Sequence, residues 1–234
     1  MLTFSSIMLG SLASTRSRST PLMHHTTTPT QTSVQGGSLR TWTYCNPRLS
    51  QVQVLLETEG RPFDADVELW HGPANTPCKM RVYGEDGVLH PFRAVVETPR
   101  GPSTIAIRNI GQLEFPMTAT VSSEYVDRPS SECIRSSMLI QGGSLRTYPF
   151  HPRVERVQVL LQTDGRPLNA RIELLQGPNN NKQVVELYTE DGCERPLFCV
   201  LNTPGAGNVV RLLNTAPLEF PLLAGVAPCR VPPP

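Results

Sequence analysis

The sequence predicts an all-β protein made of two tandem homologous domains, each an antiparallel β-sandwich or a related barrel. The first observation is a duplication: the string Gln-Gly-Gly-Ser-Leu-Arg-Thr at residues 35–41 returns letter for letter at residues 141–147. Further strings recur in register about 105 residues on, giving roughly 30 identities over about 70 aligned positions. A unit of about 90 residues can fold alone, whereas solenoid and propeller repeats are about 20 to 50 residues long.

The second observation is that short strand patterns alternate with turn residues in each copy. Residues 51–58 form a run of leucine and β-branched side chains, and residues 66–69 and 104–108 alternate with a period of two. Gly and Pro mark the turns between them, at residues 59–62, 71–73, 85–87 and 98–101. This spacing leaves no room for long helices and predicts six or seven strands per copy.

The repeat also sets the expected domain boundaries. We expect a targeting or disordered leader at 1–34, a first β domain at 35–125, a Ser-rich linker at 126–140, a second β domain at 141–227 and a Pro-rich tail at 228–234. Proline excludes a helix in the tail, which is either free or a strap onto a neighbouring molecule.

The leader has the composition of a targeting segment. It combines a short apolar stretch at residues 2–12 with Arg16, Arg18 and many Ser and Thr, and no acidic residue precedes Glu57. This pattern is typical of an organelle transit peptide, alone or after a signal. The alternative is a disordered tail.

Composition argues against nucleic acid and membrane partners. The formal net charge is +1, from 21 Lys and Arg against 20 Asp and Glu, so no basic field exists to hold a phosphate backbone. No apolar run approaches the roughly 20 residues of a membrane-spanning helix, so we expect no transmembrane segment. All cations except Lys79 and Lys182 are Arg, which suits lasting contacts with carboxylates and aromatic rings, although GC-rich coding DNA gives the same bias.

The six cysteines are not shared between the copies, since none faces a cysteine at the matching position. A disulfide framework needed for folding would have been duplicated with the domain, so we expect reduced thiols. There is no Cys-x-x-Cys pair or zinc-type spacing, and Cys193 and Cys199 are expected to be ordinary strand or turn residues.

No catalytic motif is present, so the sequence predicts neither an enzyme nor a cofactor or metal site. His71, His90 and His151 have no counterpart in the other copy and are expected to be solvated loop or surface residues. The Glu-Asp-Gly strings at 85–87 and 190–192 are expected to be hairpin turns rather than calcium ligands.

The retained Gln-Gly-Gly-Ser-Leu-Arg-Thr string is the stronger clue to function, because it leads in each copy into an aromatic residue, Trp42 or Tyr148. One interpretation is an edge strand that only closes the sandwich. The other is an exposed edge that pairs with another chain through Arg40 or Arg146 and the aromatic residue. With Trp70, these four are our candidates for self-association. A unit that docks on the second unit of a neighbour makes a heterologous contact, which can propagate into a sheet or tube.

Several longer strings add a resemblance. They are Gly-Gly-Ser-Leu-Arg-Thr-Trp, Val-Gln-Val-Leu-Leu, Gly-Arg-Pro, Asp-Val-Glu-Leu-Trp-His-Gly-Pro, Lys-Met-Arg-Val-Tyr and Ile-Ala-Ile-Arg-Asn, within residues 35–226. In these strings the chain resembles the pyrenoid shell (PyShell) proteins of diatoms and related algae. The resemblance implies tandem β-rich domains that assemble into a sheet around the Rubisco matrix of the plastid pyrenoid, supporting CO2 concentration and carbon fixation. It also implies copies of the chain itself as partners, with Rubisco or the pyrenoid matrix as a further candidate.

The sequence therefore predicts a structural, self-assembling protein of the plastid pyrenoid without a catalytic centre. The alternative is a tandem carbohydrate- or protein-binding module, since β-sandwiches often present aromatic residues to ligands. Such a module would keep its aromatic platform in both copies. The second copy instead has Tyr148 for Trp42 and Leu175 for Trp70, so we expect the two units to make different contacts.

Overall fold

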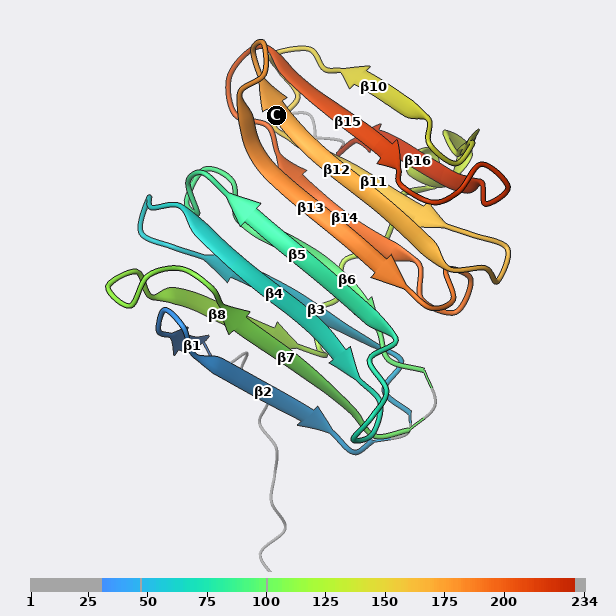
Figure 1. Ribbon diagram of the computed structural model, residues 1–234. Coiled ribbons are helices and arrows are strands. Elements are labelled where there is room, and N and C mark those ends of the chain that lie inside the picture. Colours follow the sequence, from blue (N-terminus) through green and yellow to red (C-terminus); the bar gives the residue numbers. More distant parts are fainter. Residues whose placement is uncertain (1–30, 47, 100, 230–234) are drawn as a thin grey trace, which may run out of the picture.

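All strands of the described residues belong to two eight-stranded antiparallel sheets (Figure 1). The structure is a computed structural model that describes residues 31–46, 48–99 and 101–229. The predicted all-β, sandwich-like fold class is confirmed. The first copy of the repeat forms β1 Gln31–Val34, β2 Leu39–Tyr44, β3 Gln51–Glu57, β4 Phe63–Trp70, β5 Cys78–Gly84, β6 Phe92–Glu97, β7 Ser103–Asn109 and β8 Met117–Ser122. The second forms β9 Met138–Ile140, β10 Leu145–Pro149, β11 Arg156–Gln162, β12 Leu168–Gln176, β13 Asn181–Thr189, β14 Leu197–Asn202, β15 Asn208–Asn214 and β16 Leu222–Pro228.

Both sheets run through both copies of the repeat, which we call the first and second halves. The first sheet has the order β1-β8-β3-β6-β14-β11-β16-β9, and the second has β10-β15-β12-β13-β5-β4-β7-β2. The halves meet where β6 pairs with β14 and where β5 pairs with β13. We call these two pairings the seam. Because both sheets are continuous across it, the halves lie side by side in one sandwich.

The two halves are related by an approximate two-fold axis at the seam. Each strand of the first half has a counterpart in the second half whose label is eight higher, for example β1 and β9. The two strands of each pair occupy mirror-image positions in the strand order. The counterparts β1 and β9 form the two outer edges of the first sheet, and β2 and β10 form those of the second. The sandwich thus has two open ends, one in each half.

Strict alternation along the strands builds the core. On β4, Phe63, Ala65, Val67 and Leu69 are buried between the sheets, while the residues between them face outward. The other strands contribute in the same way, and one contiguous apolar cluster joins the two halves. The alternation gives each sheet an apolar inner face, and the two inner faces pack together, while β6, β14 and β16 of the first sheet are also buried on their outer side.

Two segments expected to lie outside the β domains carry structure. Residues 31–34, assigned to the leader from sequence, form β1, which pairs with residues 117–120 of β8. The expected linker contains the short helix α1 Ser131–Arg135 as well as β9. Each half thus has eight strands rather than six or seven. The rest of the expected leader, residues 1–30, and residues 230–234 of the tail lie outside the described residues.

The linker covers the outer face of the first sheet. Cys133 of α1 is fully buried there, in a cluster with Val95, Leu160 and Phe198 from three strands of that sheet. Two glutamine side chains of the sheet, Gln53 and Gln158, each accept a hydrogen bond of 2.8 Å from a linker backbone N–H. The linker is therefore a packed part of the sandwich that bridges both halves.

His90 corrects one sequence-based expectation. It was expected to be a solvated residue, but it is 2% exposed and its ring Nδ1 lies 3.1 Å from the carbonyl oxygen of Asn202 in the other half. The pattern of the sequence could not show this, because the contact depends on the seam. Burial lowers the pKa of His90, so the neutral imidazole is favoured in the folded state. His71 is partly exposed and His151 is exposed.

The Glu-Asp-Gly strings form turns, but not the expected hairpins. The turn at residues 85–87 follows β5 in the second sheet and leads to β6 in the first sheet. The Asp86 carboxylate accepts hydrogen bonds from the backbone N–H groups of Val88, at 2.8 Å, and Leu89, at 3.0 Å. Asp191 makes the matching bonds in the second half. The carboxylates thus stabilise a crossover between the sheets.

All six cysteines lie in the described part of the chain, and none forms a disulfide. Burial raises the pKa of Cys78 and Cys199 to about 12 and that of Cys133 to about 11. These three thiols therefore stay protonated at neutral pH and act as small apolar residues. No helix in the described residues is both long and apolar enough to cross a membrane.

His90 makes the stability of the seam sensitive to acid. Because the pKa of His90 is lowered on folding, the unfolded chain binds the extra proton below about pH 6.5. The free energy of unfolding is therefore expected to fall on acidification below that pH, by up to about 1.4 kcal/mol per pH unit from this group. Urea denaturation at several pH values, comparing wild type with His90→Asn, measures the effect.

The His90→Asn variant keeps an amide donor for Asn202 and is expected to show a shallower loss of stability between pH 7 and 5. His151→Asn, at an exposed position, is the matched control and should follow wild type. Equal pH slopes for His90→Asn and wild type would contradict the assignment.

Candidate self-association edges

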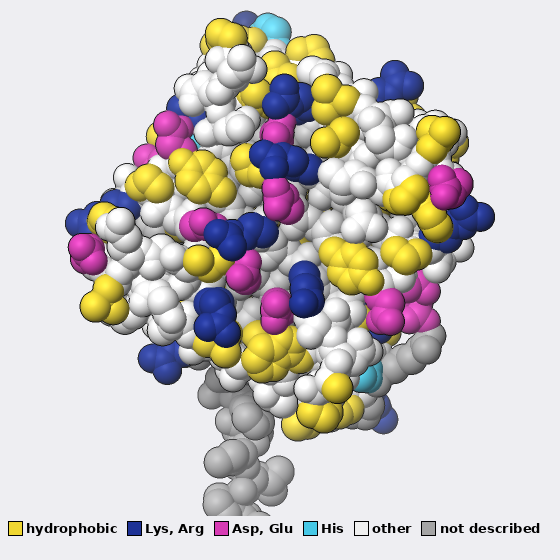
Figure 2. Space-filling view, viewed as in Figure 1, with side chains coloured by type: hydrophobic (Ala, Val, Ile, Leu, Met, Phe, Trp, Pro, Cys, Tyr) yellow, Lys and Arg dark blue, Asp and Glu magenta, His cyan; other side chains and the backbone are white. Residues whose placement is uncertain are grey.

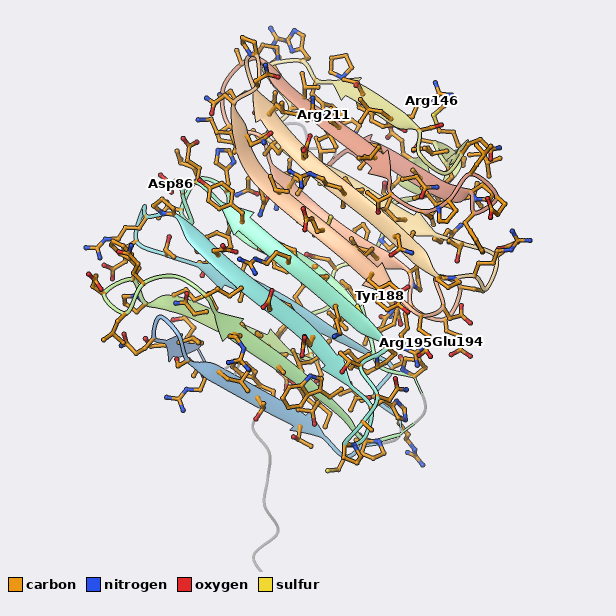
Figure 3. All side chains as sticks on the ribbon, in the orientation of Figure 1. Asp86, Arg146, Tyr188, Glu194, Arg195 and Arg211 are labelled. Carbon is orange, nitrogen blue, oxygen red and sulfur yellow. The ribbon has the colours of Figure 1, made fainter. Side chains whose placement is uncertain are left out.

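The string retained in both copies leads into the two outer edge strands of the second sheet. β2 carries Arg40 and Trp42 and pairs only with β7, and β10 carries Arg146 and Tyr148 and pairs only with β15. Figure 3 shows Arg146 at the outer side of the sandwich on β10. Each of these two strands, which lie at opposite ends of one sheet, therefore has one side on which no strand of the described residues is hydrogen-bonded.

Close backbone contacts explain why the two glycines of the string recur. A Cβ atom on Gly36 would lie 1.8 Å from the carbonyl oxygen of Gln112, and one on Gly142 would lie 1.8 Å from that of Pro217. The following glycine has a positive φ in both copies, 75° at Gly37 and 72° at Gly143. These turns lead from β1 to β2 and from β9 to β10, and only glycine fits them.

A buried asparagine ties each turn to its surroundings. The side-chain amide of Asn109 donates to the carbonyl oxygens of Val34 and Phe115, both at 2.9 Å. Asn214 does the same in the second half, to Ile140 at 3.0 Å and Phe220 at 2.9 Å. Much of what the duplication retained is thus required to hold the ends of the sandwich in shape.

The aromatic residues of the edge strands face inward. Trp42 is paired with Ile105, and Tyr148 with Val210, and both of these partners are fully buried. Trp42 and Tyr148 are themselves half-buried against the core. They therefore close the core at each end, which favours the interpretation that these residues have a structural part.

The arginines two residues earlier lie on the same side of their strands but are exposed. Burial raises the pKa of Tyr148, while the nearby charge of Arg146 opposes this shift. The Tyr148 hydroxyl is buried without a hydrogen-bond partner among the described residues. Each edge thus presents an exposed guanidinium beside a half-buried ring.

Trp70 lies apart from both edges. It ends β4, on the outer face of the second sheet, and its Nε1 donates to Glu68 at 2.7 Å. Its counterpart Leu175 is buried. The structure thus brings together Arg40 with Trp42 and Arg146 with Tyr148, but it does not bring Trp70 to either pair.

The sequence analysis missed a row of alternating charges on the outer face of the second sheet. Strand registers place five charged residues in this row, which we call the charge row, in the order Arg171, Glu186, Arg81, Asp66 and Arg108. The row continues to Leu213 and Leu145 at one end and to Leu39 at the other. Figure 2 shows alternating basic and acidic side chains running through the middle of this face. A hollow of about 630 Å³ opens beside its centre, bordered by Lys79 and Tyr188 among others.

Ion pairs link the charge row along and across the strands. Arg81 contacts Asp64 at 2.7 Å and Asp66 at 3.5 Å, and Arg171 contacts Glu173 at 2.7 Å and also pairs with Glu186. Burial opposes ionisation of Glu173, but Arg171 and its second partner Arg211 lower its pKa overall. Four charges of the row, Arg81, Asp66, Arg171 and Glu186, are thus engaged in ion pairs on this face.

The charge row distinguishes the two halves at the seam. Asp66 and Arg171 occupy matching positions, as do Arg81 and Glu186, so the charges are reversed between the copies. In the seam register Arg81 lies opposite Glu186. Two identical first halves in the same arrangement would place Arg81 opposite itself, and like charges opposite each other destabilise a sheet. This reversal was readable from the aligned repeats.

The chain matches a known protein family over most of its length. A family model described as "diatom pyrenoid shell protein" matches residues 25–228. No match was found among curated proteins. Within the described residues, no three His, Cys, Asp or Glu side chains are grouped as a metal site would require.

Reversing one charge at the seam should weaken the fold. Arg81→Glu places a carboxylate opposite Glu186 and beside Asp64 and Asp66, so we expect a loss of about 1–2 kcal/mol in the free energy of unfolding. The loss should shrink in 1 M NaCl, because salt screens exposed charges. Urea denaturation at low and high salt measures both effects.

Arg48→Glu changes the net charge equally at an exposed loop position and is the control. If the two variants lost the same stability, the charge row would have no special part in joining the halves.

Proposed function

The chain belongs to the diatom pyrenoid shell protein family, and we propose that it is a structural subunit that assembles with copies of itself into a protein layer around the Rubisco matrix. The layer would lie in the pyrenoid of the plastid and support CO2 concentration and carbon fixation. Rubisco or another matrix component is a further candidate partner on the inner side of the layer.

One observation carries the proposal: the sandwich is open at both ends, and each end exposes the edge strands of two sheets. An exposed strand edge offers backbone N–H and C=O groups to another strand. Two such ends are the minimum that a subunit needs in order to extend an assembly beyond a closed dimer. Arg40 with Trp42 at one end and Arg146 with Tyr148 at the other would supply side-chain contacts.

Weak contacts suffice for such an assembly. An edge pairing with a few arginine–aromatic contacts contributes only a few kcal/mol, but a subunit held at several places at once dissociates slowly. The outer face of the first sheet, with its linker, and the charge row of the second sheet would remain the two surfaces of the layer.

The proposed role requires no catalysis. The buried thiols are protonated, and the grouped charges on the second sheet pair with one another. We therefore propose a physical role without cofactor, metal or nucleic acid. Trp70, bonded to Glu68 and replaced by Leu175 in the other half, gives little support to a binding module with a repeated aromatic platform.

Electron microscopy of the purified full chain, at several salt and protein concentrations, tests the proposal. We expect sheets or tubes with a regular repeat, and light scattering should show large species appearing above a threshold concentration. A monomer or closed dimer under every condition would overturn self-assembly as a property of this chain.

Charge reversal at the two ends should separate assembly from folding. In Arg40→Glu/Arg146→Glu, both exposed edge guanidinium groups are replaced, so we expect assembly to need at least about tenfold more protein. The melting temperature should stay within a few degrees of wild type, because surface changes alter stability little. Arg48→Glu is the control and should assemble like wild type. Unchanged assembly of the double variant would remove these residues from the interface.

A further inference from the structure

Exposed apolar side chains lie on both faces of the sandwich at the open end of the second half, with Leu145 on the second sheet and Leu139 and Leu223 on the first. They come from α1, β9, β10, the loop before β16 and β16 itself. They are Ile134 (53% exposed), Met138 (43%), Leu139 (51%), Leu145 (50%), Leu218 (71%) and Leu223 (36%). Apolar side chains concentrated at one place on a surface generally indicate a contact with another molecule.

The open end of the first half shares two of these leucines, since Leu113 (72% exposed) matches Leu218 and Leu39 matches Leu145, but it differs at β9 and β16. In β9, Leu139 lies opposite Leu223, and in the matching place of the first half Ser33 lies opposite Thr118. Met138 likewise corresponds to Thr32. At these strand positions the two halves differ in side chains, which makes the end of the second half more apolar than the end of the first.

This asymmetry argues for one particular occupant, the same end of a second copy. The apolar end of one chain would be poorly matched by the Thr and Ser side chains of a neighbour's polar end. The apolar end of a second copy offers apolar side chains and matches it better. A contact between identical surfaces has two-fold symmetry, and antiparallel pairing of a strand with its own copy satisfies that symmetry.

The sequence of β10 allows it to pair with itself, although Pro149 points to the free edge without an N–H and so leaves one hydrogen bond per strand unmade. If the two-fold axis passes through Thr147, antiparallel pairing places Arg146 opposite the partner's Tyr148 and Leu145 opposite the partner's Pro149. Arg146 is exposed, and the half-buried ring of Tyr148 lies on the same side of the strand, with its hydroxyl buried and unpartnered within the described chain. A guanidinium beside the exposed part of a tyrosine ring makes a favourable contact.

The seam within the chain shows that two units of this fold can join edge to edge. There, two halves of the same fold join by antiparallel pairing in both sheets at once, β5 with β13 and β6 with β14. An end-to-end contact through β10 would continue the second sheet in the same manner, and the short apolar strand β9 of the first sheet lies at the same end.

We propose that the apolar end of the second half binds the same end of a second copy, through β10 strands paired antiparallel about Thr147. The proposal rests on the proposed self-assembly and names the contact that forms its basic two-fold unit. The polar ends of the first halves would then point outward from this unit and make the remaining contacts of the layer.

A cysteine on the proposed axis tests the register. In an antiparallel pair, residues directly opposite have Cα atoms about 4.5 to 5.5 Å apart, which lies in the range for a disulfide. The full chain with Cys45→Ser and Cys193→Ser, which removes the two exposed thiols, would carry Thr147→Cys. Oxidised glutathione accepts two electrons as the two introduced thiols, one from each copy, lose their protons and join, and two reduced glutathione molecules are released.

We expect a covalent dimer on non-reducing gels for Thr147→Cys. Thr41→Cys, at the matching position of β2, is the control and should give at least about fivefold less dimer at equal concentration. No dimer with Thr147→Cys, or equal amounts with both, would overturn the proposal.

A second set of variants tests the apolar contact without a new cysteine. Met138→Thr/Leu139→Ser/Leu223→Thr gives the second half the residues of the first, and the dimer dissociation constant should rise at least about tenfold in analytical ultracentrifugation. Leu89→Ser, which removes an exposed leucine elsewhere, should leave it unchanged. An unchanged constant in the triple variant, with an unchanged melting temperature, would contradict the proposal.

The two proposals can fail separately. Cross-linked dimers without sheets or tubes would support this contact and overturn assembly into a layer. Sheets or tubes formed by a chain whose Thr147→Cys variant never cross-links would support assembly and overturn this contact.

Discussion

The antiparallel pairing of β5 with β13 and β6 with β14 is the constraint on which the rest of the structure depends. Without it, each half would be a sandwich of two four-stranded sheets with four free edges. With it, the inner edges are covered, and His90 and Gln183 are buried where the halves meet. Only the outer edges remain free, so the seam determines where a second molecule can pair.

Duplication alone would have produced two equal halves, but the chain differs between them at places that matter physically. Reversed charges at Arg81 and Glu186 favour pairing of a first half with a second half. The linker covers the first sheet, and the second half has an apolar end where the first has Ser33 and Thr118. A nearly symmetric scaffold therefore carries surfaces of different chemistry, as a subunit with different neighbours on different sides requires.

Local patterns predicted much of this fold, and long-range pairing accounts for what they missed. Alternation identified β4 and β7, and the repeat identified β2 and β10. The polar strand β1 has no apolar pattern, because it is an edge strand. Its partner β8 provides most of the buried side chains at this edge. The burial of His90 and the two sheets shared by both halves depend on strand order, which period and turn residues do not contain. At the candidate edges, the sequence placed Arg40 and Arg146 correctly in exposed strands but could not show that Trp42 and Tyr148 face the core.

The central claim is that copies of this chain join through the free strands at the ends of the sandwich. Hydrogen–deuterium exchange of backbone amides, compared between the dispersed and the assembled protein, tests it most directly, because new strand pairing protects edge amides. The account predicts slower exchange in β2, β9 and β10 on assembly, with little change in the central strands β5 and β13, which are already paired on both sides. Unchanged exchange in β2, β9 and β10, with new protection confined to the faces of the sheets or to the linker, would contradict it.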